Sequence, residues 1–311
     1  MAEAERLEWV DVARGVGITA VVVGHVWTGG ALRDALYSFH MPLFFLLSGY
    51  LSRPRPPGQF ALGQLGGQMR PYAAFLLLLI AADQIIETSR GRLPVFHDWP
   101  HDIVPILLGG TWLRGPYTIF WFVPCLMMSR ILFNVLLARW GDPPGRKWMY
   151  AALACLIVAY GVSGITRDSP LGLLTVPMAV VLLWAGALWR HVEWRGSMWF
   201  ALVPLSLAGL TLVFPTLNMK AADYGWPLLS LASAIATSLL LFRLSQLSAP
   251  IGAPFVALGQ ASLVIMYLHV AFIHYLTPYL GKPWLALIAL FAPFLIWRIL
   301  RCCSPLGRIF L

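Results

Sequence analysis

Long apolar runs constrain this chain more than any other feature of its sequence. They recur from one end to the other, and each run of about twenty apolar residues can cross a hydrocarbon core of ~30 Å as a helix. Only 11% of the residues are charged, against about 25% in a soluble domain, and the mean hydropathy is +0.75. No stretch alternates with the period of two that a transmembrane barrel needs. The sequence therefore predicts an all-α, polytopic transmembrane helical bundle, and we expect one integral-membrane domain over residues 1–311.

Hydropathy predicts about ten spans. They cover roughly residues 12–30, 36–52, 71–88, 117–138, 149–165, 171–189, 197–215, 226–243, 255–277 and 283–299. The run around Ile103–Leu113 is too short to cross and is predicted to be re-entrant or interfacial. The first residues, MAEAERLEW, lack the basic segment and the cleavage site of a secretory signal, so the first span is expected to be retained.

The distribution of Lys and Arg predicts the orientation of the chain. The net charge is +9, but the basic residues are scattered over short interhelical loops, so nucleic acid is not expected as a partner. With the N-terminus in the cytoplasm, 14 basic residues fall in cytoplasmic segments, 7 fall on the other side, and Arg130 lies within a span. The seven are Arg33, Arg90, Arg92, Arg114, Arg167, Lys220 and Lys282. This bias predicts that both termini are cytoplasmic and that membrane lipid surrounds the bundle.

An ionisable side chain, His25, lies inside the first span, WVDVARGVGITAVVVGHVW. It follows Arg14 by eleven residues, or roughly 16 Å along a helix, which places it towards the outer face. An intramembrane ionisable residue indicates a functional site because burying it is costly. The alternative is a neutral histidine that hydrogen-bonds another helix.

The second span, SFHMPLFFLLSGY, returns from outside with Tyr37 and His40 near its mouth, at a depth similar to that of His25. Small residues allow membrane helices to approach closely, so Gly49 predicts a packing contact, as do Gly15 and Gly17 of the first span.

Several motifs together resemble the membrane-bound acyltransferase family 3. The specific part is DVARG, then GH at His25, then FHMPLFFLLSGYL in the second span. Three later pieces agree with it, namely QMRPYAAF, IFWFVPCLM and LGQASLVIMYLHVAF. The likeness covers almost the whole chain, is moderate in the late span and is weak in the middle.

The resemblance implies transfer of an acyl group, often acetyl, from cytoplasmic acyl-CoA to a hydroxyl of a sugar or glycan across the membrane. The chain looks like the stand-alone form of the family, without an added hydrolase-like domain. It is similar in style to the forms that modify lipid-linked glycans, exopolysaccharides or nodulation oligosaccharides. A bacterial inner membrane is the expected location.

These considerations predict a set of site residues. The catalytic group is His25 with Asp11 and Arg14, and Asp11 is expected to pair with Arg14 at i,i+3. Arg14 and Arg70 are predicted to bind the phosphates of acyl-CoA, chiefly through the resemblance; the alternative is that they set topology or bind lipid headgroups. The predicted acceptor-binding residues are Tyr37, His40, Asp83, Glu87, Trp121 and His269, and no metal site is predicted.

Histidine suits general-base catalysis because its ordinary pKa is near neutral. His25 would take the proton of the acceptor hydroxyl, and an acyl-enzyme on His25 or a nearby serine is an open alternative. The partner of His25 is also open among Tyr37, Ser48, Asp83, Glu87 and His269.

Other patterns have less specific interpretations. Asp83 and Glu87, at i,i+4, are expected either to hold the hydroxyls of an acceptor sugar or a proton, or to form an interfacial pair on a solvated helix end. The HDWPHD stretch at residues 97–102 is interpreted as an outer loop rather than a metal site. Trp112, Tyr117 and Trp121 form an interfacial belt or stack on a sugar. His269 is expected to face the bundle and His274 the outer boundary, because they lie about 140° apart on a helix.

Two other functions are compatible with the sequence. A glycan or lipid exporter would use the intramembrane histidines as a proton relay. A non-enzymatic scaffold would need His25 only for stability.

Overall fold

The computed structural model describes residues 7–163, 165–166, 168–248 and 252–311. Two basic residues of the orientation argument, Arg6 and Arg167, lie outside them. The described residues form helices and one isolated bridge between Asn218 and Asp223. The helices are α1 (Glu8–Val26), α2 (Ala31–Tyr37), α3 (His40–Leu51), α4 (Pro57–Gln64), η1 (Leu65–Met69), α5 (Arg70–Ser89), α6 (Ile103–Leu108), η2 (Gly110–Trp112), η3 (Gly115–Tyr117), α7 (Phe122–Trp140), α8 (Arg146–Ser163), η4 (Pro170–Thr175), α9 (Val176–Trp189), α10 (Met198–Leu210), η5 (Met219–Ala221), α11 (Leu229–Ser248), α12 (Ala253–Gln260), α13 (Ser262–Leu276), α14 (Lys282–Cys302) and α15 (Ser304–Phe310).

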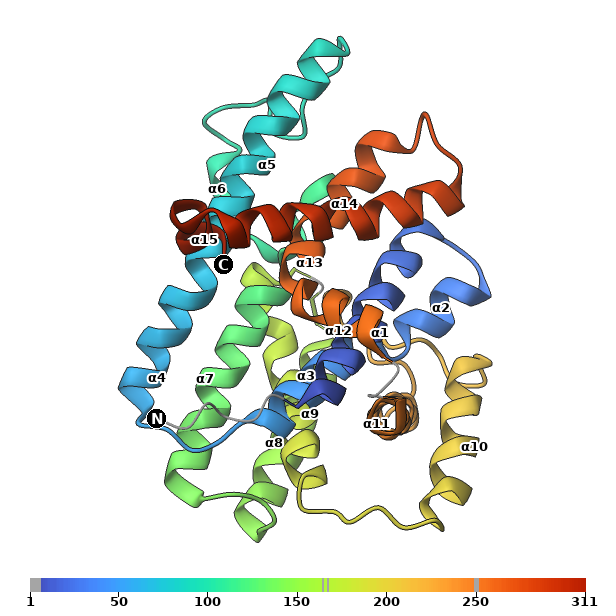
Figure 1. The fold of residues 1–311 in the computed structure, drawn as a ribbon. Coiled ribbons are helices and arrows are strands. Elements are labelled where there is room, and N and C mark those ends of the chain that lie inside the picture. Colours follow the sequence, from blue (N-terminus) through green and yellow to red (C-terminus); the bar gives the residue numbers. More distant parts are fainter. Residues whose placement is uncertain (1–6, 164, 167, 249–251) are drawn as a thin grey trace.

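This fold confirms the predicted helical membrane bundle but not the count of about ten spans. Among the described residues, 6 helices are long and apolar enough to cross a membrane, or 7 if the pair α12–α13, bent by 79°, is one span. Figure 1 shows that the helices do not all run in one direction, since α11 is seen end-on whereas α7 and α10 are seen from the side.

The missing spans have local causes. The predicted span 36–52 is divided, because α2 ends at Tyr37 and α3 starts again at His40. The 12 residues of α3 extend only about 18 Å. Helix α10 has 13 residues, and α8 begins with Arg146 and Lys147, whose charges lower its hydropathy. The short run near residue 103 forms the six-residue helix α6, consistent with an interfacial segment.

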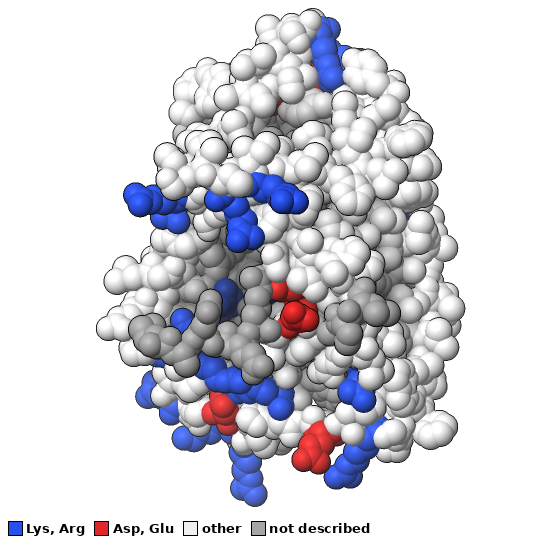
Figure 2. Space-filling view, viewed as in Figure 1, with Lys and Arg blue, Asp and Glu red and all other residues white. Residues whose placement is uncertain are grey.

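Much of the molecular surface is apolar. Large side chains stay exposed on the outer faces of helices, for example Leu77 at 65%, Ile85 at 71% and Phe200 at 85%. Figure 2 shows Lys and Arg gathered mainly over the lower and left parts of this face, with uncharged surface over most of the rest. Such a surface suits contact with lipid rather than water.

Helix α1 is the centre of the bundle and carries both Arg14 and His25. It packs against α2, α3, α11, α12, α13 and α14. The approach to α12 is close, since a Cβ at Gly15 would overlap the backbone carbonyl of Phe255. The predicted packing role of Gly15 is confirmed, and Gly17 likewise leaves room for the side chain of Leu43.

Helices α3 and α9 approach each other as closely as α1 and α12 do. A Cβ at Gly49 would overlap the carbonyl oxygen of Leu183, and one at Gly186 would overlap that of Leu46. The serine-glycine end of α3 therefore exists for packing, as predicted. Helix α3 also packs on α1, where Leu43 lies against Gly17, and this contact places His40 relative to His25.

Candidate active site

Two cavities are lined in part by residues of α1 and α3, the helices that contain the DVARG, GH and FHMPLFFLLSGYL motifs. The arginine cavity, of about 340 Å³, is lined by Arg14, Ser48, Gln68, Arg130, Ser262 and Tyr267 among others. The histidine cavity, of about 250 Å³, is lined by His25, Arg33, Tyr37, His40, Trp121 and Lys220 among others.

Residues that line the two cavities are close neighbours along the chain. On α3, Met41 lines the histidine cavity and Phe44 lines the arginine cavity, a separation of one helical turn. Trp121 lines one cavity and its neighbour Phe122 the other. The same helices therefore present different groups to two adjoining spaces.

His25 is surrounded by aromatic and imidazole rings. The hydroxyl of Tyr37 lies 3.4 Å from its Nδ1, at hydrogen-bonding distance. The ring of His269 is 5.1 Å away in an edge-to-face arrangement. Of the open candidates for a partner of His25, the structure thus brings Tyr37 and His269 to it. Ser48 instead lines the arginine cavity.

Two further histidines have defined tautomers. The Nδ1 of His40 lies 2.8 Å from the carbonyl of Leu36, and the Nδ1 of His269 lies 2.8 Å from that of Ile265. A carbonyl only accepts, so each Nδ1 donates and each Nε2 keeps a lone pair in the neutral ring. The Nε2 of His269 is buried and has no hydrogen-bond partner among the described residues.

Two cations also line the histidine cavity. The Arg33 guanidinium lies 4.2 Å from the centre of the Tyr37 ring and pairs with Asp34 at 2.8 Å. Lys220 donates to the hydroxyl of Thr118 and, at 3.4 Å, to the carbonyl of Leu113. Burial and the nearby Arg114 lower the pKa of Lys220 to about 8.

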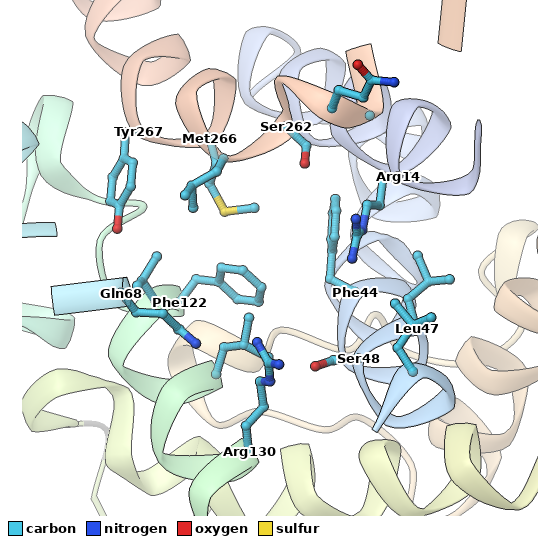
Figure 3. A pocket seen from close by; sticks show the side chains of 16 residues that line it. Arg14, Phe44, Leu47, Ser48, Gln68, Phe122, Arg130, Ser262, Met266 and Tyr267 are labelled. Atoms are coloured by element: carbon cyan, nitrogen blue, oxygen red, sulfur yellow. The ribbon is translucent and has the colours of Figure 1, made fainter. Parts of the chain in front are cut away.

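The arginine cavity contains polar groups that protein atoms do not satisfy. Figure 3 shows Arg14 and Arg130 reaching into it from opposite walls, with Tyr267 at a third side. The predicted pair of Arg14 and Asp11 is confirmed at 3.5 Å. The Nε of Arg130 and the hydroxyl of Tyr267 are buried without a hydrogen-bond partner in the described part of the chain. A ligand with several acceptor oxygens would satisfy these groups.

Three predicted site residues lie away from both cavities. Asp83 is fully buried and accepts hydrogen bonds from the Tyr275 hydroxyl at 2.6 Å and from the Val95 amide at 2.7 Å. Glu87 pairs with Arg90 at 3.0 Å. These contacts tie the C-terminal end of α5 to α13 and to the following loop. Arg70 is exposed at the start of α5, near Gln68 but outside the cavity lining.

The structure also bears on the aromatic, histidine and metal-ligand patterns of the sequence. Tyr117 and Trp121 are buried, at 0% and 4% exposure, so they are not part of an interfacial belt, and Trp121 lines the histidine cavity. His269 is buried and His274 exposed, as predicted. Among the described residues, no group of three His, Cys, Asp or Glu side chains is arranged to hold a metal.

Sequence reasoning missed several residues of these cavities, among them Arg33, Arg130 and Lys220. Arg130 was visible as a charge within a predicted span, and intramembrane charge indicates function. Lys220 had no comparable signal, because its loop is remote in sequence from His25 and only the fold brings the two together.

Comparison with known proteins adds one finding. Residues 7–302 match the acyltransferase 3 family, whose model is described as an acyltransferase domain. No curated protein and no solved structure matches the chain. The family match spans nearly the whole sequence and includes both cavities. The chain therefore belongs to the acyltransferase 3 family, which supports an acyltransferase activity in an integral membrane protein.

Proposed function

We propose that the protein transfers an acyl group, most simply acetyl, from acyl-CoA in the arginine cavity to a glycan hydroxyl in the histidine cavity. The observation that carries this proposal is the pair of adjoining cavities on shared helices, one rich in arginine and one built around His25. A donor and an acceptor can then reach the partition between the cavities from opposite sides of the membrane, with acyl-CoA on the cytoplasmic side of a bacterial inner membrane.

The chemistry of the arginine cavity suits a phosphorylated donor. Arginine binds phosphate through paired, charge-assisted hydrogen bonds. Arg14 and Arg130 would take the phosphates of CoA, and Arg70, exposed nearby, would act at the entrance. Asp11 orients Arg14 through their ion pair and lies about four helical turns from His25 along α1, so its role is positional.

In the reaction, the acceptor hydroxyl gives its proton to His25 and its oxygen attacks the thioester carbonyl. The carbon–sulfur bond breaks, and the CoA thiolate leaves and takes up the proton that His25 accepted, which returns His25 to its neutral form. Tyr37 orients the His25 ring, and the His269 ring packs edge-to-face against it. Trp121 offers a face on which a sugar can stack. An acyl-enzyme on His25 would use the same groups.

The test uses purified protein in nanodiscs with acetyl-CoA and a panel of glycans. Release of free CoA and the mass of the acceptor are followed for the wild type, His25→Ala and the control His274→Ala, which alters an exposed histidine. We expect acceptor-dependent CoA release in the wild type and the control, and its loss in His25→Ala. Full activity of His25→Ala would remove His25 from the mechanism. Absence of CoA binding and turnover with every acceptor would overturn the donor assignment and favour transport.

A further inference from the structure

We propose that the acceptor carries a negatively charged group, a carboxylate or a phosphate, that binds between Lys220 and Arg33 in the histidine cavity. This inference rests on the proposed function, because it specifies the acceptor of the same site. It assigns Lys220 a role in acceptor specificity.

The first support is the incomplete coordination of Lys220. An ammonium group has three N–H donors, and the protein accepts two of them, at the Thr118 hydroxyl and the Leu113 carbonyl. No ion pair to Lys220 occurs among the described residues. Its remaining donor is available to a molecule in the cavity that it lines.

The second support is the charge of the cavity. Its lining contains Arg33 and Lys220 but no Asp or Glu. Asp34 neutralises Arg33 from outside the lining, and Lys220 has no such neighbour. A half-buried cation without a counter-charge is costly, and an anionic acceptor would supply that charge.

The third support is the set of charges around Lys220. Arg114 repels it from the neighbouring segment, and His25 faces it across the cavity. Asp223, in the same loop, accepts a hydrogen bond from the Gly225 amide at 3.2 Å. The two hydrogen bonds that Lys220 donates go to neutral oxygens, and a neutral donor could make them equally well. They therefore do not explain why this position carries a positive charge.

The geometry also relates the charge to the reaction. Lys220 and His25 line one cavity of about 250 Å³, so an anionic group at Lys220 would hold the acceptor while a hydroxyl of the same sugar reached His25. Charge-assisted hydrogen bonds are stronger than neutral ones and fix orientation.

The experiment compares three oligosaccharides of equal length, one neutral, one ending in a uronic acid and one bearing a sugar phosphate. Binding of each is titrated without acyl-CoA, and kcat/KM for acetyl transfer is measured separately. The proteins are the wild type, Lys220→Met, Lys220→Arg and the control Lys282→Met, which alters an exposed lysine. The two charged probes distinguish carboxylate from phosphate.

We expect the wild type and Lys282→Met to favour at least one charged probe by about tenfold or more. Lys220→Met should lose that preference while its use of the neutral probe is retained, and Lys220→Arg should restore much of it. Equal binding of charged and neutral probes by the wild type would overturn the inference, even if acetyl transfer occurs. An equal loss for all probes in Lys220→Met would show that Lys220 only supports the fold. Preferential binding of a charged probe without transfer to any acceptor would support the anion site and count against the proposed function.

Discussion

The arginine cavity and the histidine cavity share helices but differ in how their polar groups are held. In the arginine cavity, Arg130 and Tyr267 keep buried polar atoms without hydrogen-bond partners among the described residues. In the histidine cavity, Tyr37 contacts His25, and backbone carbonyls fix the rings of His40 and His269. The first arrangement suits a bound molecule with many acceptor oxygens, and the second suits positioned chemistry. This difference suggests that donor binding and proton transfer take place in different cavities, and substitutions in each cavity can test that separation.

The largest effect should come from His25→Ala. Loss of a general base lowers rates by about 10²–10⁴-fold, so kcat should fall by that factor. Affinity for acetyl-CoA, measured by titration in nanodiscs, should stay unchanged because His25 lies outside the arginine cavity. A large loss of CoA affinity in this variant would contradict the assignment of donor binding to the arginine cavity and proton transfer to the histidine cavity.

Arg130→Gln should give the opposite pattern. Hydrogen bonds to charged groups contribute about 1.5–3 kcal/mol, so the KM for acetyl-CoA should rise roughly 10- to 100-fold with a smaller change in kcat. Steady-state kinetics on the purified variant measure both quantities. Arg139→Gln is the matched control, since Arg139 is exposed on the same helix. An unchanged KM in Arg130→Gln would remove this residue from the donor site.

The pH dependence should distinguish charged from neutral acceptors. Because the pKa of Lys220 is lowered to about 8, the lysine is cationic below that pH and becomes neutral above it. The kcat/KM for an anionic acceptor should therefore fall as pH rises through about 8, by up to tenfold per unit, relative to a neutral acceptor. Lys220→Arg should abolish that relative fall, because arginine stays charged. A relative fall that persists in Lys220→Arg would assign the titration to another group.

The smallest effect should come from Tyr37→Phe. It removes one hydrogen bond to His25, and about 1 kcal/mol corresponds to a roughly fivefold lower kcat. Tyr279→Phe, at an exposed position, is the control. A fall as large as that of His25→Ala would mean that Tyr37 takes part in the chemistry itself.

The sequence predicted the local features of the site better than the distant ones. Helical spacing predicted the pair Asp11–Arg14, and close packing followed from Gly15 and Gly49. The meeting of His25 with His269 required the packing of α1 against α13, which periodicity does not encode.

Two differences between the sequence patterns and the structure have the same physical origin. Asp83 and Glu87 look like a ligand pair at i,i+4, but the fold satisfies them with Tyr275, Val95 and Arg90. Hydropathy depends on composition alone, so it predicted one span over residues 36–52, where the structure has the end of α2 and a separate helix α3. Tertiary hydrogen bonds and breaks in helices depend on neighbours that a linear pattern does not show.

Entry of the two substrates from opposite sides of the membrane can be measured in proteoliposomes of one orientation. Orientation is read from the accessibility of a protease site added after Leu311, and acetyl-CoA and a glycan acceptor are supplied on chosen sides. Acceptor acetylation is measured by mass. We expect transfer only when acetyl-CoA is on the side of Arg14 and Arg130 and the acceptor is on the side of His25 and Lys220. Transfer only when both substrates are on the same side would contradict it.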